Sequence, residues 1–159
     1  MADKGRTSKK QLIDQVVSEF RASGNQDDAF DNLAAARLGL SRTDLHCVNA
    51  IENAGGLTAG QLAVESGLTT GAVTGVIDRL ERAGFARRVP DHHDRRRVIV
   101  EVTPEFYARA GKIWGPVRAD WEATMAANFT VAELERILEF LRLTTEIGGR
   151  HADRLSGPG

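Results

Sequence analysis

The sequence has very few cysteines and no long apolar run, and each shortage excludes a class of protein. Its one cysteine, Cys47, cannot form an internal disulfide framework or a thiolate zinc site. No run of about 18 apolar residues is present, and the polar start MADKGRTSKK lacks the apolar stretch of a signal peptide. We therefore expect no membrane partner and, by default, a reducing cytoplasmic setting.

A net charge of one sign is also missing. The 21 Lys and Arg residues nearly balance the 22 Asp and Glu residues, so the formal net charge is -1. A domain that binds nucleic acid is ordinarily basic, so this value argues against such a partner. What is present is an ordinary globular composition. The 159 residues are 42% hydrophobic, which suits one domain with extensions and argues against disorder throughout.

Motifs of enzymes are absent as well. The sequence contains no glycine-rich phosphate loop, no G-x-S-x-G elbow and no paired acid-base signature, so we predict no catalytic residue and no cofactor. The run from Asp91 to Asp94, with His92 and His93 between them, is the one metal candidate. Adjacent strand residues point to opposite faces, and no ligand at helical spacing completes a set. A solvated loop is therefore favoured, and no metal is predicted.

The charges are unevenly distributed along the chain. Residues 79–97 contain seven arginines and three acids, a net charge of +4, so the rest of the chain carries −5. Arginine is suited to bidentate contacts with phosphate and guanine. A smaller basic run at residues 1–10 is either a DNA contact or a flexible arm. A solvated surface is the alternative for both runs, and their place among the predicted elements decides between the two interpretations.

Apolar periodicity and capping residues predict a mainly α protein. Helices are expected at 12–20, with a break at 24–31 and resumption at 33–38, then from Ser41 to about Ala54, from Thr58 to near Gly67, from Thr69 or Thr70 to Gly84, from Pro104, and from Thr130. Between Gly84 and Thr103 the apolar period changes to two. Strands at 85–89 and 98–102 are therefore expected to form a hairpin around a polar loop.

Two short helices joined by a tight turn predict a helix-turn-helix, whose second helix enters the DNA major groove. We expect its apolar residues Val73, Val76, Ile77 and Leu80 to face the core. The predicted DNA contacts on this helix are Thr69, Thr70, Gly71, Thr74 and Arg79. Glycines at 71 and 75 would permit close approach of the DNA. The alternative is that they are sequence drift that the helix tolerates.

The hairpin supplies a second DNA-binding element, in the manner of a wing. An arginine at its tip would enter the electronegative minor groove, and a neighbouring aspartate would orient that arginine. The predicted wing contacts are Asp94, Arg95, Arg96 and Arg97. The +4 stretch thus coincides with the predicted recognition helix and wing, which favours DNA binding over a solvated surface.

The stretch LTAGQLAVESGLTTGAVTGVIDRLERAGFARRVPDHHDRRRVIVEVT resembles the winged helix of the MarR (multiple antibiotic resistance regulator) family. The resemblance rests on VTGVIDRLERAGF and on the D-x-x-D-R-R wing leading into a V-x-V-x-V-T strand end. It implies a winged helix-turn-helix at 41–103, dimerisation helices at 11–40 and 104–150, and a flexible tail at 151–159. Asp94 and Arg96 match the family's wing-tip pair, whereas the glycine-rich recognition helix departs from the family pattern.

The resemblance also implies a function. It suggests a homodimer that regulates transcription at a palindromic operator in double-stranded DNA, as a repressor released by a small aromatic or amphipathic effector, with activation as the alternative. We expect Phe20, His46 and Trp114 to line the effector pocket, with core or dimer contacts as the alternative. Cys47 is expected to be a buried, inert thiol, with redox sensing as the alternative. A winged helix that binds proteins or ligands without an operator is the alternative function, and the arginine cluster disfavours it.

Overall fold

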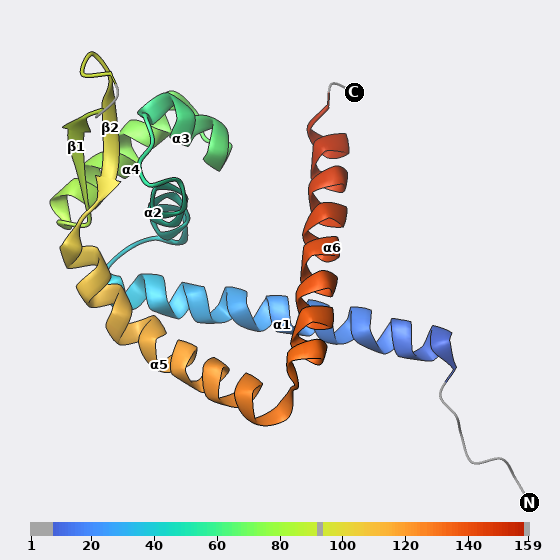
Figure 1. Cartoon of the computed structure of the whole chain (residues 1–159). Helices are drawn as coiled ribbons and strands as arrows, with labels where there is room; N and C mark the ends of the chain where they lie inside the picture. Colours follow the sequence, from blue (N-terminus) through green and yellow to red (C-terminus); the bar gives the residue numbers. More distant parts are fainter. Residues whose placement is uncertain (1–7, 92–93, 158–159) are drawn as a thin grey trace, which may run out of the picture. The chain divides into compact units, whose positions relative to one another are not determined.

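The computed structural model describes residues 8–91 and 94–157, which form helices and one antiparallel hairpin (Figure 1). The helices are α1 (Lys9–Leu38), α2 (Arg42–Ala54), α3 (Ala59–Ser66), α4 (Thr70–Arg82), α5 (Pro104–Asn128) and α6 (Val131–Ser156), and the strands are β1 (Ala86–Pro90) and β2 (Val98–Val102). The predicted mainly α architecture with a strand hairpin is confirmed. Over the described ranges, no helix has both the length and the hydrophobicity to cross a membrane.

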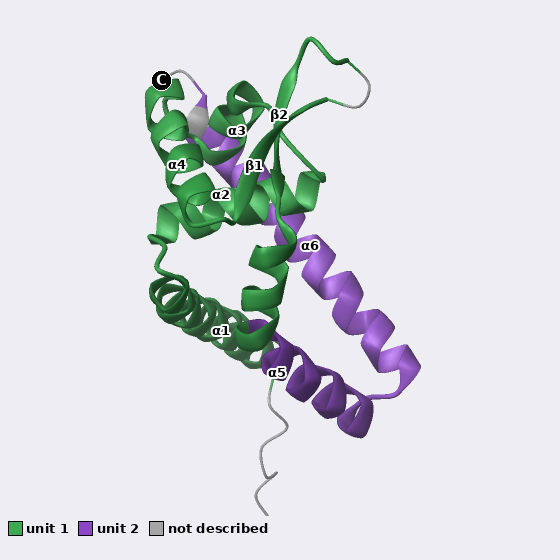
Figure 2. Cartoon of the chain, turned by 90° about the vertical axis from the view of Figure 1, so that its left-hand side faces the viewer, with its two compact units in different colours: residues 1–113 green, residues 114–159 purple. Residues whose placement is uncertain are grey.

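The chain divides into two compact units, Met1–Ile113 and Trp114–Gly159 (Figure 2). The first unit holds α1 to α4, the hairpin and the start of α5, and the second holds the rest of α5 and α6. This grouping differs from the sequence-based division at 41–103, because α1 belongs to the same unit as the helix-turn-helix. α6 continues to Ser156, so most of the tail expected at 151–159 is helical.

Capping residues set the helix ends largely as the sequence predicts. Ser41, Thr58 and Thr130 each form a capping box, in which the N-cap side chain accepts from a backbone N–H and the N3 side chain returns the contact. Thr69 rather than Thr70 caps α4. After α4 the chain reverses at Gly84, whose φ of 74° is in the left-handed region that glycine adopts without strain.

The predicted break in the first helix is wrong, because α1 runs without interruption from Lys9 to Leu38. Gly24 costs an exposed helix only about 1 kcal/mol, which the flanking turns offset. The polar stretch is also held from outside. The Arg42 guanidinium pairs with the carboxylate of Asp28 and donates to the Asp28 carbonyl oxygen at 3.1 Å, which fixes α1 against the start of α2.

The core of the first unit lies beneath α4 and the base of the hairpin. Its members on α4 are the four predicted ones, Val73, Val76, Ile77 and Leu80, all at most 1% exposed. Phe85, which follows α4, is fully buried and meets the Phe106 ring edge-on at a centroid distance of 5.6 Å. α4 and both ends of the hairpin are therefore anchored in one core.

The hairpin pairs β1 with β2 in a simple register, with Ala86 opposite Val102 and Pro90 opposite Val98. Leu57, in the α2–α3 loop, pairs with Val100 through two backbone hydrogen bonds of 3.1 and 2.7 Å. This contact holds the base of the hairpin against the helix-turn-helix. Figures 1 and 2 both show the far end of the hairpin standing out from the helices of its unit.

Candidate nucleic-acid interface

The N-terminal half of α4 presents small polar side chains to solvent. Thr69, Thr70, Gly71 and Thr74 are all exposed, as a helix that enters a groove requires. The Thr69 hydroxyl accepts from the Ala72 amide at 3.3 Å, which leaves its own proton free to donate. The Thr74 hydroxyl donates to the Thr70 carbonyl at 3.1 Å, which leaves its lone pairs free to accept. The helix start therefore offers both a donor and an acceptor.

The two glycines of α4 differ in their surroundings. A Cβ built on Gly71 would meet no atom of the described protein within 4 Å. A Cβ built on Gly75 would lie 3.4 Å from Nη1 of Arg79, an ordinary van der Waals distance. The packing of the described residues would therefore accept a larger residue than glycine at position 71. A glycine is needed there only if an outside molecule approaches the helix closely.

Four of the seven arginines at residues 79–97 are paired with carboxylates of the same chain. Arg79 pairs with Asp44 at 2.7 Å, Arg87 with Glu101 at 3.3 Å, Arg88 with Asp78 at 2.8 Å and also with Glu81, and Arg97 with Asp91 at 3.9 Å. Arg82 donates from Nε to the Asp78 carbonyl oxygen at 3.2 Å. The positive charge found in the sequence is thus largely engaged within the protein.

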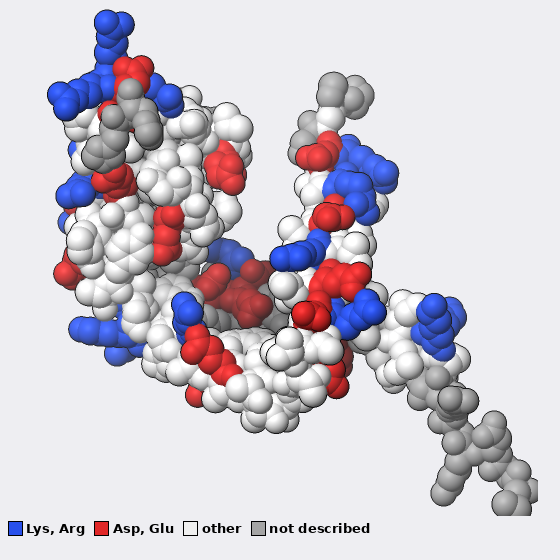
Figure 3. Space-filling view, in the orientation of Figure 1, with Lys and Arg blue, Asp and Glu red and all other residues white. Residues whose placement is uncertain are grey.

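Arg95 and Arg96 are the exception. Both are exposed at the end of the hairpin, and neither guanidinium pairs with a carboxylate of the described residues. Figure 3 shows Lys and Arg side chains gathered around this end of the hairpin. The two arginines are therefore available to a phosphate or to a narrow groove outside the protein.

Asp94 acts on the hairpin turn differently from the sequence-based expectation. Its Oδ1 accepts from the backbone amide of Arg96 at 3.0 Å, and its carbonyl accepts from the Arg97 amide at 2.8 Å. The aspartate thus shapes the turn that carries the arginine, through the backbone and not through the guanidinium. His92 and His93 lie outside the described residues.

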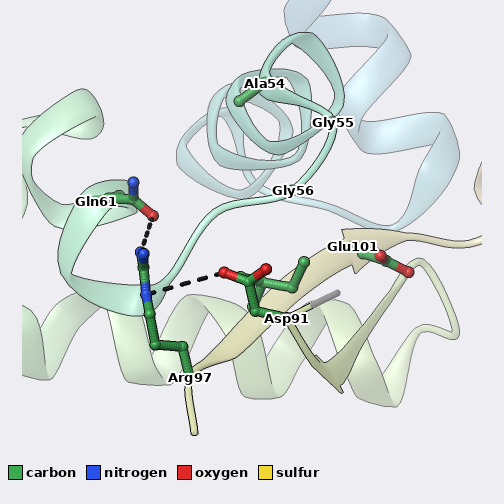
Figure 4. Close-up of a pocket in the computed structure, with 8 residues that line it drawn as sticks. Ala54, Gly55, Gly56, Gln61, Asp91, Arg97 and Glu101 are labelled. Atoms are coloured by element: carbon green, nitrogen blue, oxygen red, sulfur yellow. Dashed lines mark hydrogen bonds and ion pairs between the residues drawn. The ribbon is translucent and has the colours of Figure 1, made fainter. Parts of the chain in front are cut away.

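Arg97 lies where the hairpin loop enters β2, and it lines a polar pocket of about 330 Å³ (Figure 4). The figure shows its guanidinium between Asp91 and Gln61 of α3, and the Nη2–Oε1 distance to Gln61 is 3.5 Å. That same Oε1 accepts from the Thr58 amide at 3.0 Å in the capping box of α3. Arg97 therefore ties the hairpin to the helix-turn-helix, a role that its expected DNA contact did not include.

Asp44 is the residue that sequence reasoning missed. Its side chain is 4% exposed, in the first turn of α2. Burial alone would raise the pKa of this carboxyl, but hydrogen bonds from Arg79 and Ser41 outweigh burial and lower the pKa below 3.8. Its position three residues after Ser41 in a capping box was visible in the sequence. Its second partner, 35 residues away, was not.

This lowered pKa predicts how the stability of the protein depends on pH. A carboxyl with a lowered pKa stabilises the fold above its unfolded-state pKa, and this contribution is lost only as the pH falls through the lower, folded-state pKa. Asp44→Asn should therefore lower the free energy of unfolding by a constant amount between pH 7 and about 5, and by less below pH 3.8. Urea unfolding across this range tests the expectation, with the exposed Asp14→Asn as control. A difference that vanishes by pH 5 would contradict it.

The three residues expected to line an effector pocket belong to two units, so their shared pocket stays a prediction. Phe20 on α1 is 45% exposed and His46 on α2 is exposed, while Trp114 belongs to the other unit. Cys47 is fully buried, and burial raises the pKa of its thiol, which confirms the expectation of a buried thiol. No group of His, Cys, Asp and Glu in the described part of the chain is arranged to hold a metal ion.

Known proteins are similar to this chain in sequence and in fold. Residues 40–98 match the sequence model of the MarR family. The chain is 36% identical over 152 residues to the uncharacterized HTH-type transcriptional regulator YcgE of Bacillus subtilis, covering 94% of this chain and 97% of the relative. It is 30% identical over 105 residues to the multiple antibiotic resistance protein MarR of Salmonella typhimurium, covering 64% and 73%. A MarR family protein from Bacillus stearothermophilus has a similar structure, with a TM-score of 0.66 at 17% identity over 89% of this chain and 99% of that one.

Proposed function

This chain belongs to the MarR family of DNA-binding transcriptional regulators, and we propose that it is a homodimeric repressor of a palindromic operator, released by a small aromatic or amphipathic ligand. One observation carries the proposed mode of binding. Arg95 and Arg96, whose guanidinium groups pair with no carboxylate of the described residues, lie on the hairpin next to a recognition helix whose exposed start is Thr-Thr-Gly. Charge, exposure and the helix-turn-helix thus converge on one region of the first unit.

In the proposed complex, the start of α4 enters the major groove and the hairpin reaches the adjacent minor groove. The free hydroxyl functions of Thr69 and Thr74 face base edges or phosphates, and Gly71 lets the helix backbone approach closely. Arg95 and Arg96 supply positive charge to the minor groove, which attracts arginine where it is narrow. Asp94 shapes the hairpin loop, and Arg97 ties that loop to α3.

The exposed apolar residues of α1 and α6 support the proposed homodimer. On α1 they are Leu12, Ile13, Val16, Val17 and Phe20, each 45–52% exposed, and on α6 they include Leu138, Leu141 and Ile147, each 45–48% exposed. Apolar residues in rows along two helices are costly to leave in water. Pairing them with a second copy of the chain would set two recognition helices about 34–36 Å apart, one turn of DNA.

Release by a ligand follows from this two-fold geometry. A ligand that binds one separation of the recognition helices better than another shifts the population between them and weakens simultaneous docking on both half-sites. Phe20, His46 and Trp114 are the proposed contacts for such a ligand. An aromatic, partly polar set of this kind suits a small aromatic or amphipathic molecule.

Selection of bound fragments from genomic DNA with the purified protein should recover a palindrome, which then serves as the probe for variants. Arg96→Ala should weaken binding to this operator about tenfold, because each half-site loses a charged minor-groove contact. Fluorescence anisotropy at several salt concentrations measures the effect. Arg118→Ala, on an exposed arginine of α5 paired with Glu122, is the control. Unchanged affinity for Arg96→Ala would refute the assignment of the hairpin as a DNA-binding wing.

A further inference from the structure

We propose that Arg79 is a positioning residue, which fixes the recognition helix α4 on α2 through the buried carboxylate of Asp44 and does not itself bind DNA phosphates. The inference rests on the proposed docking of α4 in the major groove. It changes the expectation from the sequence, where Arg79 is one of several arginines facing the DNA. It also assigns a role to Asp44, which lies on a different helix from the DNA contacts.

The geometry of the pair is bidentate. Nε of Arg79 lies 3.1 and 3.2 Å from the two carboxylate oxygens of Asp44, and Nη2 lies 2.7 Å from Oδ1. The same carboxylate also accepts from the Ser41 hydroxyl at 2.7 Å and from the Ser41 amide at 3.2 Å. Asp44 is therefore a fully hydrogen-bonded anion, and Arg79 is its counter-ion.

Burial makes this pairing hard to exchange for a phosphate contact. The Asp44 side chain is 4% exposed, whereas that of Arg79 is 46% exposed. If Arg79 turned away to a DNA phosphate, it would leave a buried carboxylate without a counter-ion, which is strongly unfavourable. Nη1 of Arg79 also lies close to Gly75, at 3.4 Å from the position a Cβ would take there. The pair therefore persists when DNA binds.

A second ionic contact fixes the other side of the same helix. Arg88 on β1 pairs with Asp78 and Glu81 of α4, and its backbone amide donates to Glu81 at 3.0 Å. α4 is thus tied to α2 by Arg79 and to the hairpin by Arg88. Because base readout depends on where the helix lies in the groove, loosening the Asp44 contact should reduce discrimination between operator and other DNA more than it reduces general attraction to DNA.

The experiment compares Asp44→Asn and Arg79→Lys with the unchanged protein. Asp44→Asn keeps an oxygen that can cap α2 but removes the charge that holds Arg79. Arg79→Lys keeps the positive charge but loses the bidentate geometry. Binding is measured on the operator recovered by selection and on a scrambled duplex of the same length, as a function of salt. Arg82→Lys, on the same helix, is the matched control. All measurements are made at a temperature where circular dichroism shows each variant folded.

We expect both variants to lower the ratio of operator affinity to scrambled-duplex affinity about tenfold, with little change in the salt slope. A mere loss of stability would not change this ratio in a folded protein. The double variant Asp44→Asn/Arg79→Gln, which removes both charges, should be no worse than either single change, because the two residues act as one unit. If Arg79→Lys does not fold, the affinity ratio is measured on this double variant instead.

The opposite pattern would overturn the inference. If Arg79 binds a phosphate in each half-site, Arg79→Lys keeps most of the affinity, Asp44→Asn has no effect on DNA binding, and Arg79→Gln reduces the salt slope of the dimer by about 2. Gly71→Leu distinguishes this failure from failure of the proposed docking. If Gly71→Leu reduces operator binding while Asp44→Asn does not, only the positioning role is wrong. If neither variant has an effect, α4 does not read the operator and both proposals are wrong.

Discussion

Replacing Gly71 by leucine is expected to stabilise the protein and to abolish operator binding. Leucine favours a helix over glycine by up to about 1 kcal/mol, and the structure has open space for the new side chain. On the operator, however, this side chain would occupy the space through which α4 approaches the DNA. A steric cost of about 1–3 kcal/mol at each of two half-sites lowers the affinity by about 30-fold to 10⁴-fold.

The decisive result is that Gly71→Leu raises the stability of the protein while it lowers the affinity for the operator. Thermal unfolding measures the stability, and anisotropy on the selected operator measures the binding. Gly71→Ala should fall between the two proteins in affinity, because its side chain is smaller. Gly111→Ala is the control, since this glycine of α5 is also exposed and has no neighbour within 4 Å. If Gly71→Leu binds the operator as well as the unchanged protein does, the glycine reflects tolerated drift and α4 does not approach DNA closely.

Acidic substitutions on the apolar face of α6 are expected to dissociate the dimer and so to cause a second large loss of operator affinity. Leu138→Glu/Leu141→Glu places two charges in a row of residues that are 48% and 45% exposed in the single chain. If a second copy covers this row, each charge must be buried without a partner, and the dimer dissociates. A monomer engages one half-site only, and it loses the gain from linked binding, which is about 10²- to 10⁴-fold.

Light scattering gives the mass directly. The unchanged protein should have twice the chain mass of 17.3 kDa and the double variant should have the chain mass itself. Arg136→Gln is the control, because it changes the charge of α6 on the side opposite the apolar row. A double variant that remains a dimer would place the interface elsewhere. An unchanged protein that is a monomer at micromolar concentration would refute the half-site geometry.

The sequence predicted those features that depend on local interactions. N-caps such as Ser41 and Thr58 lie directly before the residues they cap, and the apolar spacing of α4 identified its buried face. The change of period after Gly84 predicted the hairpin. The expected break in α1 was wrong, because one glycine and several polar residues do not end a helix that is also held from outside by Arg42.

The sequence showed where the arginines lie along the chain but not which of them are paired with carboxylates. Counting residues along the chain could not show that Arg79 pairs with Asp44, because 35 residues separate them. The pairing of Arg88 with α4 and of Arg97 with Gln61 of α3 likewise depends on the tertiary fold. Such partners emerge only when the helix-turn-helix and the hairpin are packed together. The sequence thus located the arginine-rich stretch, and the structure distinguished the arginines that have carboxylate partners from Arg95 and Arg96, which have none among the described residues.

The internal pairing of these arginines also has a consequence for how quickly the protein finds its target. A regulator must search a chromosome that offers a vast excess of wrong sites, and every unpaired cation lengthens its stay on each of them. Here Arg79, Arg87, Arg88 and Arg97 already have carboxylate partners. Encounters with random sequence should therefore be short-lived, so that the protein samples many sites by brief visits and lingers only where the recognition helix fits.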